Sequence, residues 1–316
     1  MRRPRSTGSG AGAVRFRTPV HAPFRIPVHP PFHIHTHVHI PFSWSRPMTQ
    51  DLSPVTRIPR AGLPPRAVVV GDPQRAALVG ALLEDAREVS YHREYRVFSG
   101  SWKGVPMLVA SHGVGAPGAI LLFQELADAG VRTFLRFGTA GSMRPGIGDG
   151  DLVIAEAAVR DDGVTQQLLP PEYPAVSSPE AVLALQRAAR EAGAPHHRGI
   201  VWTRAAFQPG LLPLFSYEGA GLAAIEMELS ALLVTASLRG LVAGGVVVID
   251  GANADELVDE SALLSTGGYN PHREIVAEGV ERGAVVSLEA LRLLAEAEYE
   301  AGTGAGTGAD DKEPLV

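Results

Sequence analysis

The fold is decided by one short stretch of the chain, Ala67-Val68-Val69-Val70-Gly71-Asp72-Pro73. Its run of apolar, mostly β-branched residues predicts a short strand that is buried on both faces of a sheet. Pro73 fits the first position of a helix, because the N–H that proline lacks would have no partner inside the helix there. A buried strand that passes directly into a helix is typical of a parallel sheet covered by helices.

The same alternation of strand and helix continues towards the C-terminus. Apolar runs predict strands at residues 95–102, 106–111, 133–139, 151–159, 199–203 and 245–250. Helices are predicted at residues 116–129, 179–192, 228–239 and 270–298. The chain is therefore predicted to have an α/β fold, a single domain with three α/β/α layers around a central mixed, mostly parallel sheet.

The two ends of the chain differ in composition from this domain. Residues 1–47 contain seven arginines and no acidic residue, and prolines and histidines alternate with apolar residues there. Repeated proline removes backbone donors, so residues 1–47 are predicted to be a disordered Arg/Pro/His-rich extension. The domain is predicted to span residues 48–300, and residues 301–316, rich in Gly, Thr and acidic residues, are predicted to form a disordered tail.

The histidines of the extension leave one alternative open. His33, His35, His37 and His39 occupy alternate positions. Imidazoles spaced in this way could bind a transition metal. The sequence predicts no metal site elsewhere.

Composition argues against several functional classes. The chain of 316 residues has a net charge of −6, which leaves −13 on residues 48–316, and an acidic domain argues against nucleic-acid binding. No run of about 18 apolar residues occurs, so no membrane-spanning helix is expected. The sequence has no cysteine, which excludes disulfides and thiolate chemistry and suits a cytoplasmic protein.

Polar residues and glycines gather at the predicted strand ends, where ligands bind in an open α/β sheet. Glycine lets backbone N–H groups approach an oxyanion, and arginine supplies a planar fork of donors, so the two together suit phosphate. Carboxylates suit sugar hydroxyls or proton transfer. The residues at these ends are Gly71, Arg75, Gly113, Gly115, Arg136, Thr139, Glu226, Glu228 and Asp250.

Each of these features also has a purely structural interpretation. A Gly-Asp-Pro sequence commonly forms a turn, and glutamates can simply begin a helix, where the helix dipole favours them. Arg136 lies in an apolar strand and needs an anionic or hydrogen-bonding partner, which either a ligand or another side chain could provide. Asp250 could cap the end of its strand.

Five motifs follow one another along the domain: Gly71-Asp72-Pro73-x-Arg75, His92-Arg93-Glu94-Tyr95, His112-Gly113-Val114-Gly115-Ala116-Pro117, Arg136-Phe137-Gly138-Thr139-Ala140-Gly141 and Glu226-Met227-Glu228. In this order they resemble the nucleoside phosphorylase family, which includes uridine phosphorylases and hexameric purine nucleoside phosphorylases. The resemblance extends over residues 67–294, and residues 159–163 and 171–176 are most similar to the uridine phosphorylase branch.

The resemblance implies a role for each matching residue. The expected phosphate-binding residues are Gly71, Arg75, Arg93, Arg136 and Thr139, with Arg93 contributed by the neighbouring subunit of a dimer. The expected ribose-binding residues are Met227 and Glu228. The expected base-binding residues are Phe207, which packs on the base, and Asp250, which lies beside a purine. Arg136 and Asp250 are the expected catalytic residues.

The resemblance also implies the reaction and the partners. A nucleoside and inorganic phosphate are the substrates, phosphate being a co-substrate, and no cofactor is expected. Phosphate must lie beneath C1′ of the sugar, both as nucleophile and as a charge that opposes the oxocarbenium-like transition state. A residue shared between subunits implies a homo-oligomer, either a dimer or a trimer of dimers. No nucleic acid or membrane partner is expected.

Two departures from the family bear on the substrate. Uridine phosphorylases recognise uracil with Gln and Arg where this sequence has Leu211 and Pro213, and together with Asp250 this favours a purine nucleoside over uridine. The family also has a histidine before the first strand that reaches the 5′-hydroxyl. Residues 51–64 contain no histidine, so a 5′-modified nucleoside stays open.

Three other functions stand as alternatives. The chain could be a uridine phosphorylase. A nucleosidase of the same fold would use water in place of phosphate, and would not need the arginines Arg75, Arg93 and Arg136. A non-catalytic nucleoside-binding protein would keep Phe207 and Glu228 without needing Arg75 and Arg93.

Overall fold

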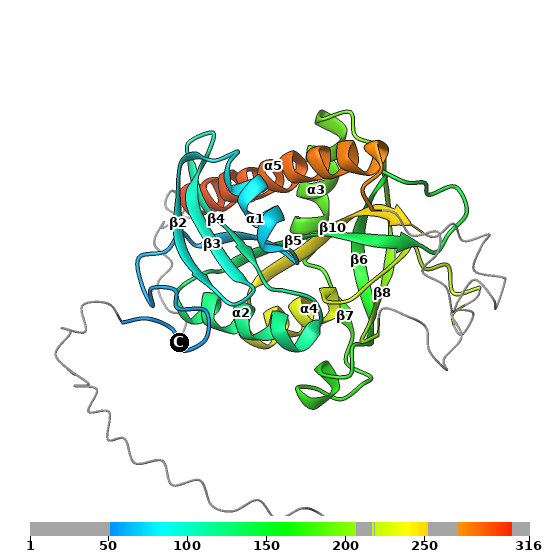
Figure 1. The fold of residues 1–316 in the computed structure, drawn as a ribbon, viewed down its shortest axis with the longest axis horizontal. Coiled ribbons are helices and arrows are strands. Elements are labelled where there is room, and N and C mark those ends of the chain that lie inside the picture. Colours follow the sequence, from blue (N-terminus) through cyan, green and yellow to red (C-terminus); the bar gives the residue numbers. More distant parts are fainter. Residues whose placement is uncertain (1–50, 207–216, 218, 252–270, 305–316) are drawn as a thin grey trace, which may run out of the picture. The chain divides into compact units, whose positions relative to one another are not determined.

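A computed structural model describes residues 51–206, 217, 219–251 and 271–304 of the chain (Figure 1). These residues form an α/β domain with a mixed sheet, which confirms the predicted fold class. The predicted extension at residues 1–47, most of the predicted tail, and the predicted base-binding residue Phe207 lie outside the described residues.

The secondary structure follows the predicted order. The strands are β1 (Arg66–Val70), β2 (Glu84–His92), β3 (Tyr95–Trp102), β4 (Val105–Ser111), β5 (Thr133–Ser142), β6 (Leu152–Asp161), β7 (Ala175–Val176), β8 (His196–Arg204), β9 (Ala224–Glu226) and β10 (Val242–Gly251). The helices are α1 (Pro73–Gly80), α2 (Ala116–Asp128), the 3-10 helix η1 (Thr165–Gln167), α3 (Pro179–Glu191), α4 (Leu229–Arg239) and α5 (Glu274–Gly304). None of the described helices is long and apolar enough to cross a membrane.

The middle of the sheet is parallel. β1 lies between β4 and β5, and β5 also pairs in parallel with β10. At one end of the sheet β3 and β2 add antiparallel strands, while β6, β8 and β9 lead from β10 back to β5. The strands β5, β10, β6, β8 and β9 therefore close into a ring, which sequence periodicity does not predict because it carries no information on strand partners.

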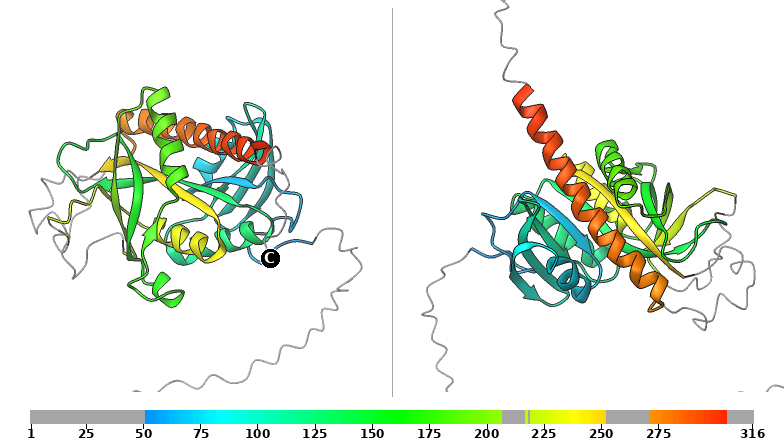
Figure 2. Two further views of the ribbon diagram at one scale, coloured as in Figure 1. Left: turned by 180° about the vertical axis from the view of Figure 1, so that it is seen from behind. Right: turned by 90° about the horizontal axis from the view of Figure 1, so that it is seen from above.

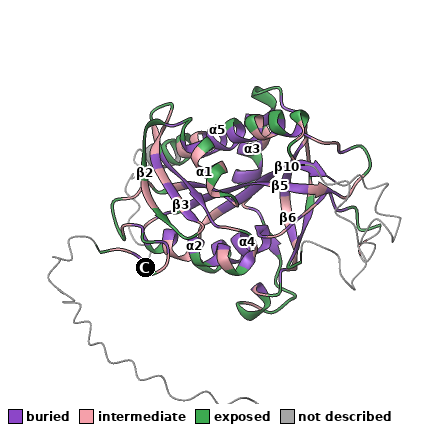
Figure 3. Ribbon diagram, in the orientation of Figure 1, coloured by how far each residue is buried: buried purple, intermediate pink, exposed green. Residues whose placement is uncertain are grey.

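Helices cover both faces of the sheet (Figure 1). α1, α3 and α5 pack on one face, with α5 running obliquely across the strands in Figure 2, and α2 and α4 pack on the other. Val68 and Val70 of β1 join the core on the side of α5, whereas Ala67 and Val69 join the core on the side of α2. β1 is thus buried on both faces, as its apolar run predicts. The neighbouring central strands β5 and β10 are also mostly buried (Figure 3).

Three strands form that the sequence pattern does not predict: β2, the two-residue β7, and β9. β2 has the sequence EDAREVSYH, is mostly exposed and lies at the end of the sheet, so little apolar patterning is needed to form it. β9 is only three residues long, too short for a periodicity to show. It forms because β5 on one side and β8 on the other supply backbone partners.

Candidate active site

The loops that follow β1 and β4 are joined at one edge of the sheet. The N–H of His112 donates to the carbonyl of Val70, and the N–H of Gly113 donates to the carbonyl of Gly71, both at 2.9 Å. A Cβ added at Gly71 would lie only 3.5 Å from the carbonyl oxygen of Gly113 and 4.0 Å from Cε1 of His112. The predicted phosphate-binding glycine therefore borders the imidazole of His112.

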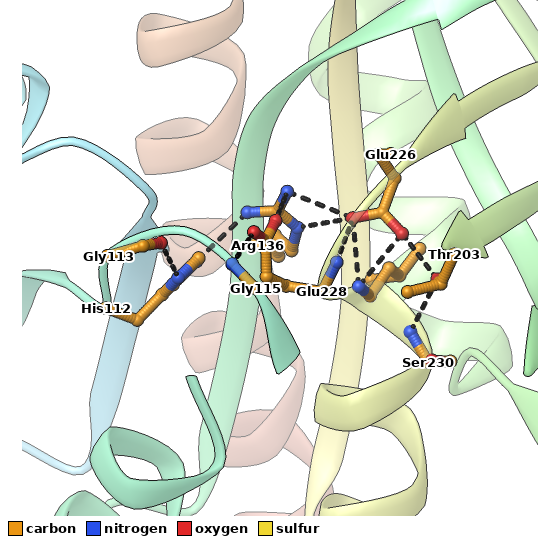
Figure 4. A network of polar contacts seen from close by, with 9 residues as sticks. His112, Gly113, Gly115, Arg136, Thr203, Glu226, Glu228 and Ser230 are labelled. Carbon is orange, nitrogen blue, oxygen red and sulfur yellow. Dashed lines mark hydrogen bonds and ion pairs between the residues drawn. The ribbon is translucent and has the colours of Figure 1, made fainter. Parts of the chain in front are cut away.

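Arg136 lies in β5 and is the centre of a buried polar cluster, with 3% of its surface exposed. Its Nε donates to Glu226 at 3.0 Å, its Nη1 to Nε2 of His112 at 3.0 Å, and its Nη2 to Glu228 at 2.5 Å (Figure 4). We call Arg136, His112, Glu226 and Glu228 the Arg136 cluster. Its members come from segments far apart in the sequence, and they meet beside the carboxyl ends of β1 and β4.

The hydrogen bonds of His112 fix its tautomer. A guanidinium can only donate, so Nε2 accepts from Arg136, and Nδ1 must carry the proton that is donated to the carbonyl of Gly113 at 2.8 Å. Complete burial, and then the charge of Arg136, hold the pKa of His112 well below its usual range. His112 is therefore a neutral acceptor that orients Arg136 without adding charge to the site.

Glu226 holds the start of α4. Its carboxylate accepts from the N–H of Glu228 at 2.8 Å, from the N–H of Leu229 at 2.9 Å and from the hydroxyl of Thr203, in addition to Arg136. Backbone N–H groups at a helix start have no partner within the helix, and a carboxylate there is favoured by the helix dipole. The structural interpretation, in which this glutamate serves the start of a helix, therefore accounts for Glu226. The same carboxylate also neutralises part of the charge of Arg136.

Glu228 joins Arg136 to the start of α2. One carboxylate oxygen accepts from Arg136 and the other from the N–H of Gly115, each at 2.5 Å. Burial, reinforced by the nearby carboxylate of Glu226, raises the pKa of Glu228 against the opposing effect of Arg136. Burial also disfavours the charge of Arg136, but Glu228 and Glu226 outweigh it and raise the pKa of Arg136.

The charge balance of the cluster decides what can bind beside it. The one guanidinium of Arg136 is shared between two carboxylates, so an anion that binds here needs further positive charge. Arg75, in α1, is a further positive charge nearby: its charge lowers the pKa of His112, and its guanidinium carbon lies 5.8 Å from the centre of the Phe137 ring. Thr139, half-buried, lies further along β5 and pairs with Val248 of β10.

Arg93 lies at the rim of the site rather than in the Arg136 cluster. It is exposed, with φ of 57°, in the two-residue turn that joins β2 to β3. The next residue, Glu94, packs against Gly113, where an added Cβ would lie 2.7 Å from Cγ of Glu94. The turn therefore packs on the loop after β4, while Arg93 is exposed at the surface of the domain.

Asp250 lies at the end of β10 and is buried, with 4% of its surface exposed. Ile249 pairs with Ala140 of β5 but Gly251 pairs with Gly141, so Asp250 is the extra residue of a β-bulge. Bulges of this kind occur beside active sites, where they change the direction of a side chain. Met227 is half-buried between Glu226 and Glu228.

Sequence reasoning assigns no role to two residues of this network, His112 and Thr203. His112 follows β4 directly, and Thr203 is a buried polar residue near the end of β8. A polar residue at or just beyond the end of an apolar strand is the signal that could have found both. Among the described residues, no group of three or more His, Asp and Glu side chains could hold a metal ion.

Comparison with known proteins identifies the family. Residues 65–292 match the phosphorylase superfamily. The chain is 36% identical over 244 residues to a uridine phosphorylase from Thermococcus kodakarensis, covering 73% of this chain and 82% of that protein. It is 34% identical over 244 residues to a purine nucleoside phosphorylase from Plasmodium vivax, covering 76% of this chain and 96% of that protein. The chain belongs to the nucleoside phosphorylase family.

A solved structure of the nucleoside phosphorylase family has the same fold. The crystal structure of a purine nucleoside phosphorylase from Toxoplasma gondii in complex with immucillin-H is 31% identical to this chain and superposes with a TM-score of 0.71. The match covers 78% of this chain and 97% of that one. In this nucleoside phosphorylase, the Arg136 cluster at the strand ends is the candidate active site.

Gly138 provides a test of how this phosphorylase holds Arg136. A Cβ added at residue 138 would lie 2.9 Å from Nη2 and 3.0 Å from Cζ of Arg136, so Gly138→Ala should push the guanidinium away from its partners. We expect the free energy of unfolding to fall by about 1–3 kcal/mol in urea denaturation. Gly148→Ala is the matched control, because a Cβ there meets only Asp151 Oδ2, at 4.0 Å. Equal free energies of unfolding for the two variants would contradict this account.

Proposed function

We propose that this chain is a purine nucleoside phosphorylase. It cleaves the N-glycosidic bond of a purine nucleoside with inorganic phosphate and releases the free base and a (deoxy)ribose 1-phosphate. The observation that carries the proposal is the Arg136 cluster, a buried arginine bonded to Glu228 and to His112, with Gly71 next to His112 and Arg75 near enough to lower the pKa of His112. The relatives named as nucleoside phosphorylases support the same reaction class.

We propose that phosphate binds next to Gly71, Arg75 and Arg136. Gly71 lets backbone N–H groups approach an oxyanion, and Arg75 and Arg136 offer forked donors. Because His112 and Glu226 already orient Arg136, its donors need little reorganisation when phosphate binds. Thr139 is proposed to add a hydroxyl donor.

Glu228 is proposed to bind the ribose. Its carboxylate accepts from Arg136 and from Gly115. When a phosphate oxygen accepts from Arg136 in its place, the carboxylate of Glu228 can accept from the 2′- and 3′-hydroxyls. Met227 is proposed to pack on the sugar, which holds C1′ over the phosphate.

The proposed reaction needs no cofactor, since inorganic phosphate is the nucleophile. A phosphate oxygen forms the new bond to C1′ as the C1′–N bond breaks and its electron pair moves to the base. Arg136 fixes the phosphate beneath the cationic sugar, which stabilises the developing charge. Asp250 is proposed to donate a proton or hydrogen bond to N7 of the leaving purine, and Phe207 to pack on the base.

Uridine is the second candidate substrate, because the relative from Thermococcus kodakarensis is named a uridine phosphorylase. The buried acid Asp250 favours the purine, since uracil has no N7 to protonate. The positions that would recognise uracil, Leu211 and Pro213, cannot form the required side-chain hydrogen bonds. The same-fold nucleosidase is disfavoured by Arg75, Arg93 and Arg136, and the non-catalytic nucleoside-binding protein by Arg75 and Arg93.

A homo-oligomer with shared active sites is part of the proposal. Arg93 is exposed on the turn between β2 and β3, at the rim of its own site. A second copy that packs against this turn would receive Arg93 as a further phosphate donor. Pairing about a two-fold axis is the commonest symmetry for such an exchange.

Phosphate dependence tests the reaction class. With inosine as substrate, base release should require phosphate or arsenate, and the sugar product in phosphate should be a pentose 1-phosphate. Chromatography of the base and the sugar phosphate, with and without phosphate, measures both products. Release of free pentose at the same rate in phosphate-free buffer would show a nucleosidase, and no release of base from inosine or from uridine under either condition would show a binding protein.

Asp250→Asn tests the choice of base, because asparagine keeps the size of the side chain but is not a carboxylic acid. The variant should lose about a hundredfold to ten-thousandfold in kcat on inosine. It should change far less on 7-methylinosine, whose base is already activated as a leaving group. If the wild type prefers uridine and Asp250→Asn leaves that activity intact, the purine proposal is wrong.

Mixed dimers test the shared site. Arg93→Ala and Glu228→Ala should each be inactive, but a hybrid dimer has one site without either substitution, so an equal mixture should recover about a quarter of wild-type activity. Arg136→Ala mixed with Glu228→Ala is the control, since both residues belong to the same subunit's site and no intact site can form. A mixture of the first pair that stays inactive, or a fully active monomer, would contradict the exchange of Arg93.

A further inference from the structure

The turn that carries Arg93 lies at the edge of the sheet. It joins β2 to β3, and β2 is the mostly exposed end strand, with two register shifts along its pairing with β3. Exposed elements of this kind open more readily than the core of a domain. Arg93 also has φ of 57°, which residues other than glycine adopt infrequently. The turn therefore needs support from outside the sheet if it is to present Arg93 in one direction.

Residues 51–60 contact the end of β2 and supply such support. The hydroxyl of Ser90 donates to the carbonyl of Thr56 at 2.7 Å. Nδ1 of His92, the last residue of β2, donates to the carbonyl of Val55 at 2.8 Å, since a carbonyl can only accept. Whatever fixes this short segment therefore also fixes the strand end from which the turn begins.

Glu125 of α2 fixes the same two residues of the segment. One carboxylate oxygen accepts from the N–H of Val55 at 2.9 Å, and the other accepts from the N–H and the hydroxyl of Thr56 at 2.8 and 2.6 Å. Burial raises the pKa of Glu125, but these hydrogen bonds outweigh it and lower the pKa below its usual value. The half-buried carboxylate is therefore charged, and its bonds to Val55 and Thr56 join α2 to β2.

The rest of the segment is attached independently of Glu125. Ile58 is completely buried, and its carbonyl and N–H bond to the N–H and the hydroxyl of Ser53 at 2.8 and 3.1 Å. Loss of the contacts of Glu125 should therefore displace Val55 and Thr56 without releasing the whole segment.

We propose that Glu125 is a positioning residue, which holds Val55 and Thr56 against the end of β2 and so directs Arg93 into the site of the neighbouring subunit. This inference rests on the proposed exchange of Arg93 between subunits and adds the contact that orients it. Because Arg93 serves the other subunit, a substitution of Glu125 impairs the neighbour's site and leaves its own site intact.

Glu125→Gln in the full-length enzyme tests the positioning role, because glutamine keeps the size of the side chain but cannot accept at both of its ends. The KM for phosphate should rise about three- to tenfold, since binding phosphate must then also order Arg93. At saturating phosphate, kcat should stay within about twofold of the wild type. Hydrogen–deuterium exchange of residues 88–95 should become faster. Ser90→Ala, which removes one bond to the segment and leaves Glu125 in place, should change the KM and the exchange in the same direction.

Glu289→Gln is the matched control. Glu289 is also a helix glutamate that accepts from several donors, among them Nε1 of Trp102 at 2.9 Å and Nζ of Lys103 at 2.8 Å. It holds the turn at the other end of β3. Glu289→Gln should lower the melting temperature about as much as Glu125→Gln does, but it should leave the KM for phosphate and the exchange of residues 88–95 unchanged.

Hybrid dimers, isolated with two different affinity tags, show which subunit Glu125 serves. Paired with Glu228→Ala, a Glu125→Gln subunit keeps the one working site and receives Arg93 from a partner with intact Glu125. The KM for phosphate of this hybrid should be that of the wild type. Paired with Arg93→Ala, the Glu125→Gln subunit supplies the one remaining Arg93, so the KM should be raised as in the Glu125→Gln homodimer.

The outcomes separate this inference from the function on which it rests. If Glu125 acted only on its own site, the two hybrids would exchange their KM values. That result, an unchanged KM in the Glu125→Gln homodimer, or unchanged exchange of residues 88–95 would overturn the positioning role and leave the phosphorylase proposal intact. If Arg93→Ala and Glu228→Ala do not complement each other, the exchange of Arg93 fails, and this inference fails with it.

Discussion

Arg136 carries a positive charge into the interior at the strand ends, and the rest of the site is arranged around that charge. Leaving a buried charge without its partner typically costs about 3–5 kcal/mol, so the partners of Arg136 are structural necessities. Each partner also makes a second contact, because Glu226 caps α4, Glu228 holds the residue before α2, and His112 bonds to the loop after β4. The contacts that compensate the charge of Arg136 therefore also fix the positions of its N–H donors, which are the donors proposed to bind phosphate.

The sequence predicts some strands and not others, and the difference lies in how each strand is stabilised. β1 is buried on both faces and β10 is buried almost throughout, so their apolar runs are sufficient to reveal them. β2 and β9 form mainly through backbone pairing with neighbours, which leaves no apolar pattern to find. The closure of five strands into a ring also depends on which strands pair with one another, and no local sequence pattern carries that information.

The same limit applies to the site. The sequence shows that Arg136 needs a partner but cannot choose between a ligand and a side chain, because its partners are 24, 90 and 92 residues away along the chain. Glu226 and Glu228 look equivalent in the sequence. Only the pairing of β9 with β5 and β8 gives them different environments, one surrounded by the donors of a helix start, the other spanning Arg136 and Gly115.

The residues proposed for phosphate binding and the residue proposed for base recognition are held by separate contacts in this fold. The Arg136 cluster is built from β5, β9, the residue after β4 and the residue before α4, whereas Asp250 is a bulged residue held by Arg273 and by the turn before β6. None of the described residues named for the Arg136 cluster is among those named for Asp250. A change at the bulge could therefore alter which base the enzyme prefers without disturbing the guanidinium of Arg136. Relatives 36% and 34% identical to this chain are named for uridine and for purine nucleosides, which is consistent with that separation. Specificity would then diverge at the end of β10 while the buried arginine, whose removal unbalances three partners at once, stays in place.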